Sequence, residues 1–511
     1  MSQIYFEIDK FSHHFTLSKV TPHGMSVIGE FSKAYQQWGM VREHRRVFRK
    51  VVKVFATRSN DHRQYRFHIE QFPEFEKLLH NRQVHESCYT ITEHIPTPGL
   101  YAHMPVREGW TPKPHQPPII EYLIAPTPQK RKLVEIQTGE GKTFASMAAI
   151  AVIAQRLLII IKPMYMDKWV EDVQKICEIA PDEVMMVSGS AQLMQLIALA
   201  KQGQLLAKVI IISNKTMQNW ITLYEKIGDV DLEMLGYDCR PQDLMPLLNV
   251  GVRLIDEVHQ DFHLNFKLDL YAHVERSISL SATLVADDPF LTKMYELAYP
   301  KAMRFAGLPY NKYIHSYSWI YRFNKPQFIK TNEFGQTSYS HIAFEKSLMK
   351  RPVELTGYIE MIETCVRQTY LQDYKPGDKL LIYCASINLC TEVKNRLKAL
   401  HKNLDVRRYV EDDPYTNLLE PDIRVSTLLS AGTGHDIPGL TTVILTPSVS
   451  STQSNIQGFG RLREIKGRRV NFIYFVCSDF QKQIDYHEKK KLILKNTALS
   501  YSSISYPHFI G

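Results

Sequence analysis

The hexapeptide Thr138-Gly-Glu-Gly-Lys-Thr143 has the residue types of a phosphate-binding loop. Gly139 and Gly141 allow the backbone to curl until successive N–H groups point at one anion, and a helix that starts beside them adds the positive end of its dipole. Lys142 is suited to bind the β- and γ-phosphates of a nucleotide, and the Thr143 hydroxyl is suited to bind Mg²⁺. This segment therefore predicts nucleotide binding.

The same six residues could also form an ordinary turn. The full phosphate-loop pattern has a glycine where this chain has Ile136, and short Gly-x-Gly-Lys-Thr strings also arise by chance. The nucleotide-binding interpretation therefore needs other segments that supply the remaining groups of a hydrolysis site.

Two carboxylates follow an apolar segment further along the chain. Asp256 and Glu257 come directly after the run 252–255. There Asp256 could hold Mg²⁺, and Glu257 could orient or deprotonate an attacking water. An exposed acidic strand end is the alternative. Ser281-Ala-Thr283 ends the next apolar run, and its hydroxyl groups could bond to the loop that carries the carboxylates.

Two loops in the C-terminal half carry related chemistry. Gly432-Thr-Gly-His-Asp436 is glycine-rich and ends in a carboxylate. The segment 457–463 carries Arg461 and Arg463, which could stabilise the charge of a γ-phosphate. A surface loop is the alternative for this second segment.

Strands and helices alternate on both sides of residue 308, which predicts two α/β units. Apolar runs separated by helical segments indicate parallel sheets covered on both faces, in which ligands bind at the carboxyl ends of the strands. The predicted strands are 133–136, 157–161, 208–213, 252–256 and 277–281 in the first unit, and 379–384, 423–427, 441–445 and 470–475 in the second. The predicted helices are 165–179, 190–203, 215–226, 340–371 and 388–400.

A small α+β domain precedes these units. We expect strands at 49–57 and 64–69 joined as a hairpin, a helix at 72–80 and a strand at 88–92. A basic cluster could face nucleic acid or could be a solvated face of that hairpin; its members are Arg42, Arg45, Arg46, Arg49, Lys50 and Lys53. The predicted domains are 1–105, 106–308 and 309–480, followed by a C-terminal tail, 481–511, that is helical at first and then irregular.

The composition is that of a soluble globular protein with a modest basic excess. Of 511 residues, 44% are hydrophobic and 23% are charged, and the net charge of +9 permits a polyanionic partner without requiring one. The seven cysteines include no Cys-x-x-Cys pair, so we expect neither a disulfide framework nor a structural zinc site. No segment has the pattern of a signal peptide or a membrane span, so we expect a cytoplasmic protein without a membrane partner.

The order of these segments resembles that of the superfamily-two helicases, whose motor is a pair of RecA-like lobes. The matching segments, in chain order, are Gln116, Thr138–Thr143, Ile161-Lys-Pro-Met164, Asp256-Glu-Val-His259, Ser281–Thr283, Thr427 with Gly432–Asp436, and Gln457-x-x-Gly-Arg461. The resemblance implies an α/β fold with two tandem RecA-like lobes, whose parallel sheets are covered by helices, after the small α+β domain. It also implies ATP and Mg²⁺ as cofactors.

The resemblance further implies a role for each matching residue. Gln116 would contact adenine, and the rest of the nucleotide would be bound by Thr138, Gly139, Glu140, Gly141, Lys142, Thr143, Gly434 and Asp436. Thr143 and Asp256 would hold the metal, and Glu257 would activate the attacking water. Hydrolysis would be coupled to lobe movement through His259, Ser281, Thr283 and Gln457.

Two sets of contacts in the resemblance involve basic and polar side chains. The arginine finger would be Arg461, or Arg463 after a one-residue shift, because the family spaces its two arginines three apart and this chain has Glu464 there. Nucleic-acid contacts would come from Lys162, Pro163, Asn214, Lys215, Ser386 and Thr427. Apart from the resemblance, the basic cluster of the first domain offers Arg45, Arg46 and Arg49 as further candidate contacts.

Within the superfamily, the Pro-His-Gln start at residue 114, Trp169 and the small N-terminal domain are most similar to phage branch-migration helicases of the UvsW type. That similarity implies a monomeric, ATP-dependent 3′-to-5′ helicase that acts on single-stranded, forked or four-way-junction DNA in recombination, repair and replication, in the host cytoplasm if phage-encoded. An RNA helicase on the same fold, a duplex translocase that does not separate strands, and a binding module without hydrolysis are the alternatives.

Overall fold

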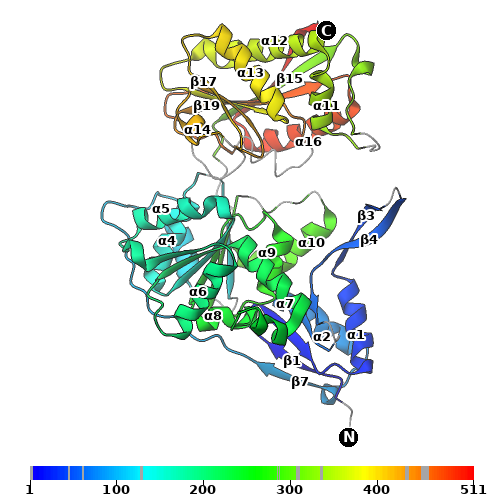
Figure 1. Cartoon of the computed structure of the whole chain (residues 1–511), viewed down its shortest axis with the longest axis vertical. Helices are drawn as coiled ribbons and strands as arrows, with labels where there is room; N and C mark the ends of the chain where they lie inside the picture. The colour runs from blue at the N-terminus through cyan, green and yellow to red at the C-terminus, as the bar shows by residue number, and fades with distance from the viewer. Residues whose placement is uncertain are drawn as a thin grey trace. The chain divides into compact units, whose positions relative to one another are not determined.

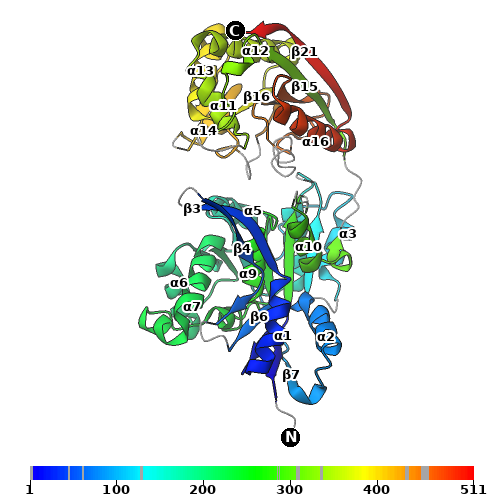
Figure 2. The same cartoon turned by 90° about the vertical axis from the view of Figure 1, so that its right-hand side faces the viewer.

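The structure is a computed structural model of the whole chain. It describes every residue except 1–3, 44–45, 60–62, 127–129, 138, 283, 285, 287, 306–310, 334–337, 412, 432–436 and 450–459, and it describes the backbone alone at 42–43, 46–47 and 229–233. The chain divides into two compact units, which comprise residues 1–308 and 309–511 apart from the short segments 137–139 and 285–287 (Figures 1 and 2). Each unit is described by itself below.

A parallel sheet forms the centre of the first unit. Its described strands follow the order β10-β11-β9-β12-β13-β8-β14. Their bounds are β8 (Arg131–Glu135), β9 (Leu157–Ile161), β10 (Val184–Val187), β11 (Val209–Ser213), β12 (Val252–Ile255), β13 (Arg276–Ser281) and β14 (Arg304–Phe305). β9 and β12 are buried along their whole length, as expected for strands with both faces covered.

Helices follow these strands as the alternating pattern predicts. They are α3 (Pro117–Ile124), α4 (Lys142–Ile153), α5 (Met166–Ile176), α6 (Ser190–Lys201), α7 (Asn214–Met234), α8 (Leu244–Leu247), α9 (Phe262–Asp269) and α10 (Pro289–Ala298), with 3₁₀ turns η3 (Pro163–Tyr165), η4 (Pro181–Glu183), η5 (Pro241–Asp243) and η6 (Lys301–Met303). The proline-rich stretch before α3 contacts this lobe at two isolated bridges, Tyr101 with Gln155 and Val106 with Cys177.

The second unit contains a second parallel sheet, with the described order β17-β18-β16-β19-β20-β15-β21. Its strands are β15 (Ile314–Phe323), β16 (Lys379–Cys384), β17 (Val406–Tyr409), β18 (Ile423–Thr427), β19 (Leu440–Leu445), β20 (Val470–Cys477) and β21 (Ser500–Ile510). Its helices are α11 (His341–Leu348), α12 (Pro352–Thr369), α13 (Ile387–Leu400), α14 (Thr416–Leu419) and α16 (Gln481–Thr497), with 3₁₀ turns η7 (Pro326–Phe328) and η8 (Leu371–Asp373).

Alternate residues of β16 point into two separate cores of the second unit. Leu380 and Ile382 belong to one hydrophobic cluster, and Leu381 and Tyr383 belong to another. Both faces of this sheet are therefore covered as well. The predicted fold class, two tandem RecA-like α/β lobes after a small α+β domain, is confirmed.

The expectation of an irregular end to the chain is wrong. The last residues form β21, which pairs in parallel with β15 from His315–Ser500 to Phe323–Ile510. β21 is serine-rich and mostly exposed, and it is held by backbone pairing at the edge of the sheet. Such a strand lacks the apolar alternation on which sequence-based assignment depends.

A mixed sheet, in the order β5-β6-β2-β1-β7, forms the N-terminal part of the first unit. Its elements are β1 (Phe6–Lys10), β2 (His14–Ser18), β5 (Thr57–Arg58), β6 (Tyr65–His68), β7 (Tyr89–Glu93), α1 (Pro22–Lys33), α2 (Phe72–Asn81), η1 (Ile69–Gln71) and η2 (Glu86–Cys88). Phenylalanines fill its core: the rings of Phe15 and Phe67 lie 5.4 Å apart, and those of Phe31 and Phe75 lie 5.0 Å apart.

The predicted hairpin of this domain has a different partner. β4 (Arg46–Val54) pairs antiparallel with β3 (Gln36–Glu43) in a separate two-stranded sheet, while β6 pairs with the short β5 and with β2. The β3–β4 ribbon therefore carries Arg42, Arg46, Arg49, Lys50 and Lys53, while Arg45 lies outside the described residues. β3 was not predicted from the sequence, because Gln36 to Glu43 lack the regular alternation of apolar and polar residues that indicates a half-buried strand.

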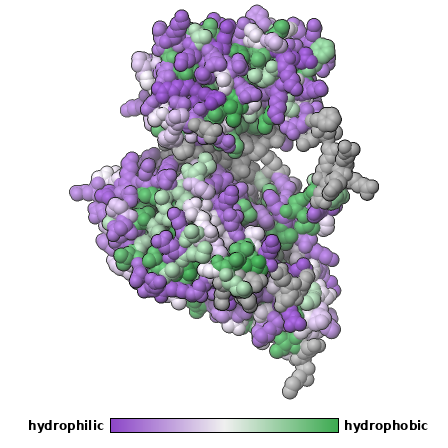
Figure 3. Space-filling model, in the orientation of Figure 1, coloured by the Kyte–Doolittle hydropathy of each residue, from purple (hydrophilic) through white to green (hydrophobic). Residues whose placement is uncertain are grey.

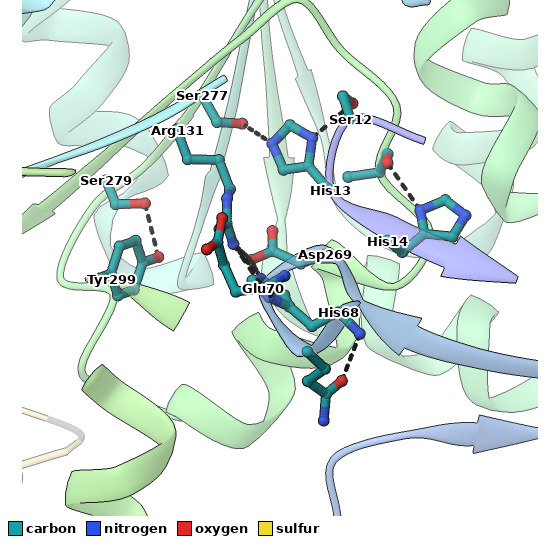
Figure 4. A network of polar contacts seen from close by, with 12 residues as sticks. Ser12, His13, His14, His68, Glu70, Arg131, Asp269, Ser277, Ser279 and Tyr299 are labelled. Atoms are coloured by element: carbon teal, nitrogen blue, oxygen red, sulfur yellow. Dashed lines mark hydrogen bonds and ion pairs between the residues drawn. The ribbon is translucent and has the colours of Figure 1, made fainter. Parts of the chain in front are cut away.

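A buried network of charged and polar groups joins the N-terminal sheet to the first lobe (Figure 4). The Asp269 carboxylate of α9 accepts from Arg253, and its Oδ2 lies 3.3 Å from Nε2 of His68. Arg131 donates to the ring of His68 and, at 2.8 Å, to Glu70. His13 Nε2 lies 2.8 Å from the Ser277 hydroxyl. Arg131, Arg253 and Ser277 lie at or near the starts of their strands, so the joint covers the amino edge of the parallel sheet.

Burial determines the protonation of this joint. Burial and the nearby Arg131 lower the pKa of His68 to about 4, and burial lowers the pKa values of His13 and His14 well below their ordinary value. Burial opposes ionisation of Asp269, but Arg253 and His68 outweigh it and hold the pKa of that carboxyl below its usual range. At neutral pH the histidines are therefore neutral and Asp269 is charged.

The visible face of the molecule is mostly hydrophilic, with scattered hydrophobic residues (Figure 3). Among the residues that the structure describes, no helix has both the length and the apolar composition needed to cross a membrane.

Acidification should loosen the joint before it unfolds the rest of the first unit. Because the three buried histidines have lowered pKa values, the unfolded state binds protons first as the pH falls below about 6.5, and each histidine costs about 1.4 kcal/mol of stability per pH unit down to its folded pKa. Amide hydrogen exchange, corrected for intrinsic rates, should show that β1, β2 and β6 are less protected at pH 5 than at pH 7. Equal protection of these strands at pH 5 and pH 7 would contradict the predicted loosening of the joint.

Candidate active site

The predicted phosphate-binding loop follows β8 and leads into α4 with the geometry that its glycines permit. Gly139 and Gly141 have φ values of +93° and +76°, in the left-handed region that favours glycine. Lys142 is the first residue of α4 and is buried, and its Nζ donates to the Ile136 carbonyl oxygen at 3.1 Å. The ammonium group therefore lies against the loop at a helix N-terminus, where anions are favoured.

Gln116 lies against this loop although it is distant in sequence. Its Oε1 accepts from the Lys113 N–H at 2.7 Å, and its Nε2 donates to the carbonyl oxygens of Glu140 and Gly141 at 3.2 and 3.3 Å. His115 also reaches the loop, with Nε2 2.9 Å from the Glu140 carbonyl oxygen. Sequence reasoning did not assign a role to His115; its position beside Gln116 was the available signal.

The two carboxylates follow β12. Asp256 Oδ1 accepts from the Glu257 N–H at 2.8 Å, and Oδ2 accepts from Trp169 Nε1 at 3.2 Å. Burial and the neighbouring Glu257 carboxylate raise the pKa of Asp256 to about 6, while the positive charge of Lys142 opposes that rise. Glu257 has a φ of +48°, an uncommon conformation for a non-glycine residue and one that occurs often at functional sites.

Trp169 contacts Asp256, which the sequence pattern around this tryptophan did not predict. It lies in α5, which follows β9, and its ring is buried. Its indole N–H favours the charged form of Asp256 and fixes the orientation of that carboxylate. A tryptophan on an amphipathic helix is usually assigned to the core, so only the packing of α5 beside β12 reveals the contact.

His259 connects the carboxylate loop to the end of β13. Its Nδ1 lies 2.7 Å from the Ser281 hydroxyl and 3.4 Å from Glu257 Oε2. Burial lowers the pKa of His259 to about 4, so the imidazole is neutral at neutral pH. The loop after β13 is in turn bound to β8, because the Leu284 N–H donates to Glu135 Oε1 at 2.7 Å.

The sheet order explains how these groups meet. β13 lies between β12 and β8, and all three strands are parallel, so the residues that follow them share the carboxyl edge. The structure thus brings together Gln116, Lys142, Asp256, Glu257 and His259. Thr143, the second residue of α4, is half-buried beside Lys142. Thr138 and Thr283 lie outside the described residues.

Two of the predicted nucleic-acid contacts lie beside the carboxylates. Lys162 and Asn214 line one small pocket together with Asp256 and Glu257, and Lys162 Nζ forms an ion pair with Asp261 at 3.1 Å. Pro163 and Lys215 are exposed on the same lobe. Lys162 and Asn214 therefore lie beside Asp256 and Glu257 in this structure.

In the second lobe, the predicted residues are engaged with their own lobe. The Ser386 hydroxyl donates to Glu345 Oε2 at 2.6 Å, and burial raises the pKa of Glu345 to about 7. The Thr427 and Ser430 hydroxyls lie 2.9 Å apart. Sequence reasoning did not identify Glu345, a buried acid inside a predicted helix.

The two candidate finger arginines differ in exposure. Arg461 is buried and its Nη2 donates to the Ala431 carbonyl oxygen at 2.6 Å. Arg463 is half-buried and its Nη1 donates to the Gly460 and Leu462 carbonyl oxygens at 2.5 and 3.1 Å. The remaining predicted residues of this lobe lie outside the described residues: Gly434, Asp436 and Gln457.

No family model and no curated protein matches this chain. Similar solved structures include the ATP-dependent Type ISP restriction-modification enzyme LlaBIII bound to DNA, with a TM-score of 0.52, 12% identity, and coverage of 78% of this chain and 31% of that chain. S. cerevisiae Dbp5 bound to RNA and ADP BeF3 has a TM-score of 0.48 at 13% identity over 78% and 91% of the two chains. The Pyrococcus furiosus Hef helicase domain has a TM-score of 0.42 at 13% identity over 74% and 98%.

At 12% identity, the similarity to LlaBIII supports the two-lobed fold alone.

Replacing Gly141 with Ala should weaken binding of a fluorescent ATP analogue by roughly tenfold or more, the scale of one lost polar contact at such a site. A Cβ there would collide with Gln116 Nε2, and the positive φ would also be strained. Gly203→Ala is the matched control, because Gly203 has a φ of +67° and open space around it. Equal affinities in the two variants would contradict the assigned loop.

Proposed function

We propose that this chain is a superfamily-two helicase that uses ATP to unwind or migrate branched or forked DNA, with 3′-to-5′ polarity. The observation that carries the proposal is the convergence of Gln116, Lys142, Asp256 and Glu257 at one edge of the first sheet. An adenine-reading amide, a phosphate-binding ammonium and two carboxylates are the groups that nucleotide hydrolysis requires on one lobe.

The residues of this chain have separate tasks in hydrolysis. Gln116 would bind adenine, and the backbone of the loop from Gly139 to Gly141 would bind phosphate with Lys142. Glu257 would take the proton of the attacking water, for which its partly exposed carboxylate, 24% accessible, is suited. His259 and Ser281 would transmit the state of that carboxylate to β13, because they are hydrogen-bonded to each other.

The chemistry of the site also fits Mg²⁺. Thr143 and Asp256 offer the hard oxygen ligands that this ion prefers, and a bound cation would offset the burial and the Glu257 charge that raise the pKa of Asp256. Bound Mg²⁺ would neutralise charge on the nucleotide phosphates. Thr143 and Asp256 would hold it, while Trp169 keeps the carboxylate oriented.

The arginine finger would be Arg461 or Arg463. Arg463 is the more exposed of the two, which favours it for a contact with a phosphate. The coupling residues Thr283 and Gln457, the nucleotide-binding residue Gly434 and the ribose contact Asp436 remain proposals that rest on the motif order alone.

A DNA substrate is favoured over RNA by two features. The box Asp256-Glu-Val-His259 differs from the Asp-Glu-Ala-Asp box typical of RNA helicases, and the first domain presents the basic β3–β4 ribbon. The similar structures themselves include one bound to RNA and one bound to DNA, so an RNA helicase is the second candidate. A translocase that moves on duplex DNA without opening it is the third.

Strand displacement with Mg²⁺-ATP tests the proposal. The chain should unwind forked and four-way DNA, with ATP consumed in proportion. Unwinding of RNA duplexes without unwinding of DNA would transfer the assignment to the second candidate. Displacement of a triplex strand without strand separation would transfer it to the third.

Glu257→Gln should bind an ATP analogue as the wild type does and lose turnover by roughly a thousandfold, because general-base catalysis contributes about 10²- to 10⁴-fold. Glu121→Gln, an exposed acid of α3, is the control and should hydrolyse ATP normally. Undiminished hydrolysis by Glu257→Gln would remove Glu257 from its assigned role.

Replacing Arg45, Arg46 and Arg49 together with Ala should weaken binding of forked DNA. Each phosphate contact that is lost should reduce the slope of log affinity against log salt concentration by about one. A triple replacement of Lys33, Lys77 and Arg82, exposed basic residues on or next to the helices of the same domain, removes the same charge elsewhere. If both triple variants showed the same dependence of forked-DNA affinity on salt concentration, the ribbon would be a solvated surface without specific DNA contacts.

A further inference from the structure

The β3–β4 ribbon, residues 36–54, is called the arm here. It is a two-stranded antiparallel sheet of its own, and Figure 1 shows it extending away from the rest of the first unit. An isolated two-stranded ribbon is only marginally stable in water. Contacts between the base of the arm, called its root, and the rest of the first unit must therefore stabilise it.

The root is packed against α9 and α10 of the first lobe. Phe55 is fully buried, and its ring lies 5.0 Å from that of Phe266 and 5.6 Å from that of Phe290. His263 Nε2 donates to the Val54 carbonyl oxygen at 2.8 Å. On the other strand, Gln37 Nε2 donates to Asp288 Oδ2 at 2.8 Å.

These two helices begin next to the catalytic loops. α9 starts at Phe262, directly after the loop that carries Asp256 to His259, and His263 is its second residue. α10 follows the loop after Ser281, and Asp288 caps it by accepting from the N–H groups of its first turn at 2.8 and 3.0 Å. The arm is therefore bound directly to the two helices that begin after the loops of the candidate hydrolysis site.

The exposed part of the arm mixes apolar and basic side chains. Trp38 and Met40 are 50% and 70% accessible, Phe48 is also exposed, and Arg49 and Lys50 are exposed beside it. The Arg49 guanidinium lies over the Trp38 ring at 5.6 Å, and this cation–π contact orients the half-accessible indole.

Both faces of the ribbon carry this mixture. In the register of the arm, Met40 pairs with Arg49 on one face, and Val41 pairs with Phe48 next to Lys50 on the other. An element that binds a lipid surface has one apolar face and one charged face. Unpaired nucleotides present flat apolar bases and phosphates together, so they match both faces of the arm.

The charge of the arm supports the same partner. Residues 36–54 contain six basic residues and one acidic residue, Glu43. This excess matches a polyanion, while the exposed aromatic rings match bases that have left their stack. Intact duplex DNA would use the basic groups and would leave the rings without a partner.

We infer that the arm binds the unpaired bases at a branch point of DNA and separates the strands there. Trp38 and Phe48 stack on bases, and Arg49 and Lys50 bind the adjoining phosphates. The anchored root transmits force from the first lobe to this contact. The inference rests on the proposed function, because it assigns the place at which the motor opens DNA.

The double variant Trp38→Ala/Phe48→Ala tests this assignment on a fork with a 3′ single-stranded arm. Base pairs opened per ATP hydrolysed should fall by roughly tenfold or more, the scale of one lost base stack. Ile95→Ala/Leu206→Ala is the matched control, because it removes two exposed apolar side chains from the same unit outside the arm. An unchanged ratio in the arm variant would overturn the inference.

A measurement on the wild-type protein is independent of whether the variant folds. Forked DNA with 2-aminopurine at the junction should change its fluorescence on binding, and 2-aminopurine ten base pairs inside the duplex should not. A wild-type protein that opens DNA without the junction signal would overturn the arm assignment alone. A wild-type protein that opens no DNA would overturn the proposed function, and the arm assignment with it.

Discussion

A parallel sheet brings the residues that follow its strands to one edge, and the candidate active site depends on that constraint. Because β13 lies between β12 and β8, the phosphate-binding loop and the carboxylate loop are one strand apart. The hydrogen bond between His259 and Ser281 links the carboxylate loop to β13, and the one from the Leu284 N–H to Glu135 links the segment after β13 to β8. Asp256 is held from a third strand, through Trp169 of the helix after β9. The positions of these groups are therefore properties of a buried sheet, and short loops only complete them.

The amino edge of the same sheet carries the joint to the N-terminal domain. Asp269, Arg253 and Arg131 are buried there, and breaking one member of such a cluster typically costs about 3–5 kcal/mol because its partners are left unpaired. The N-terminal domain and the first lobe consequently form one body. From this joint the domain extends to the first turns of α9 and α10, where the arm is anchored. The proposed nucleic-acid contacts and the proposed hydrolysis site would thus lie on the same rigidly joined unit.

The sequence predicted the parts of this protein that have local signals. Buried strands such as 157–161 appear as apolar runs, and Lys142, Asp256 and Gln116 stand in motifs whose order carries information. The contacts of Trp169, Glu345 and the arm depend on packing between distant segments, which no local pattern encodes. β21 was missed because backbone pairing at a sheet edge holds it, with little apolar burial. The two strands that were predicted to form a hairpin have other partners, because β4 pairs with β3 and β6 pairs with β2 and β5.

The most direct test of the account is the rate of ATP hydrolysis measured in parallel with no nucleic acid, single-stranded DNA, forked DNA, four-way junctions and RNA of matched length. The account predicts strong stimulation by DNA, greatest with forks and junctions, and little stimulation by RNA. Hydrolysis that is equal under all five conditions, or that is stimulated by RNA alone, would contradict it.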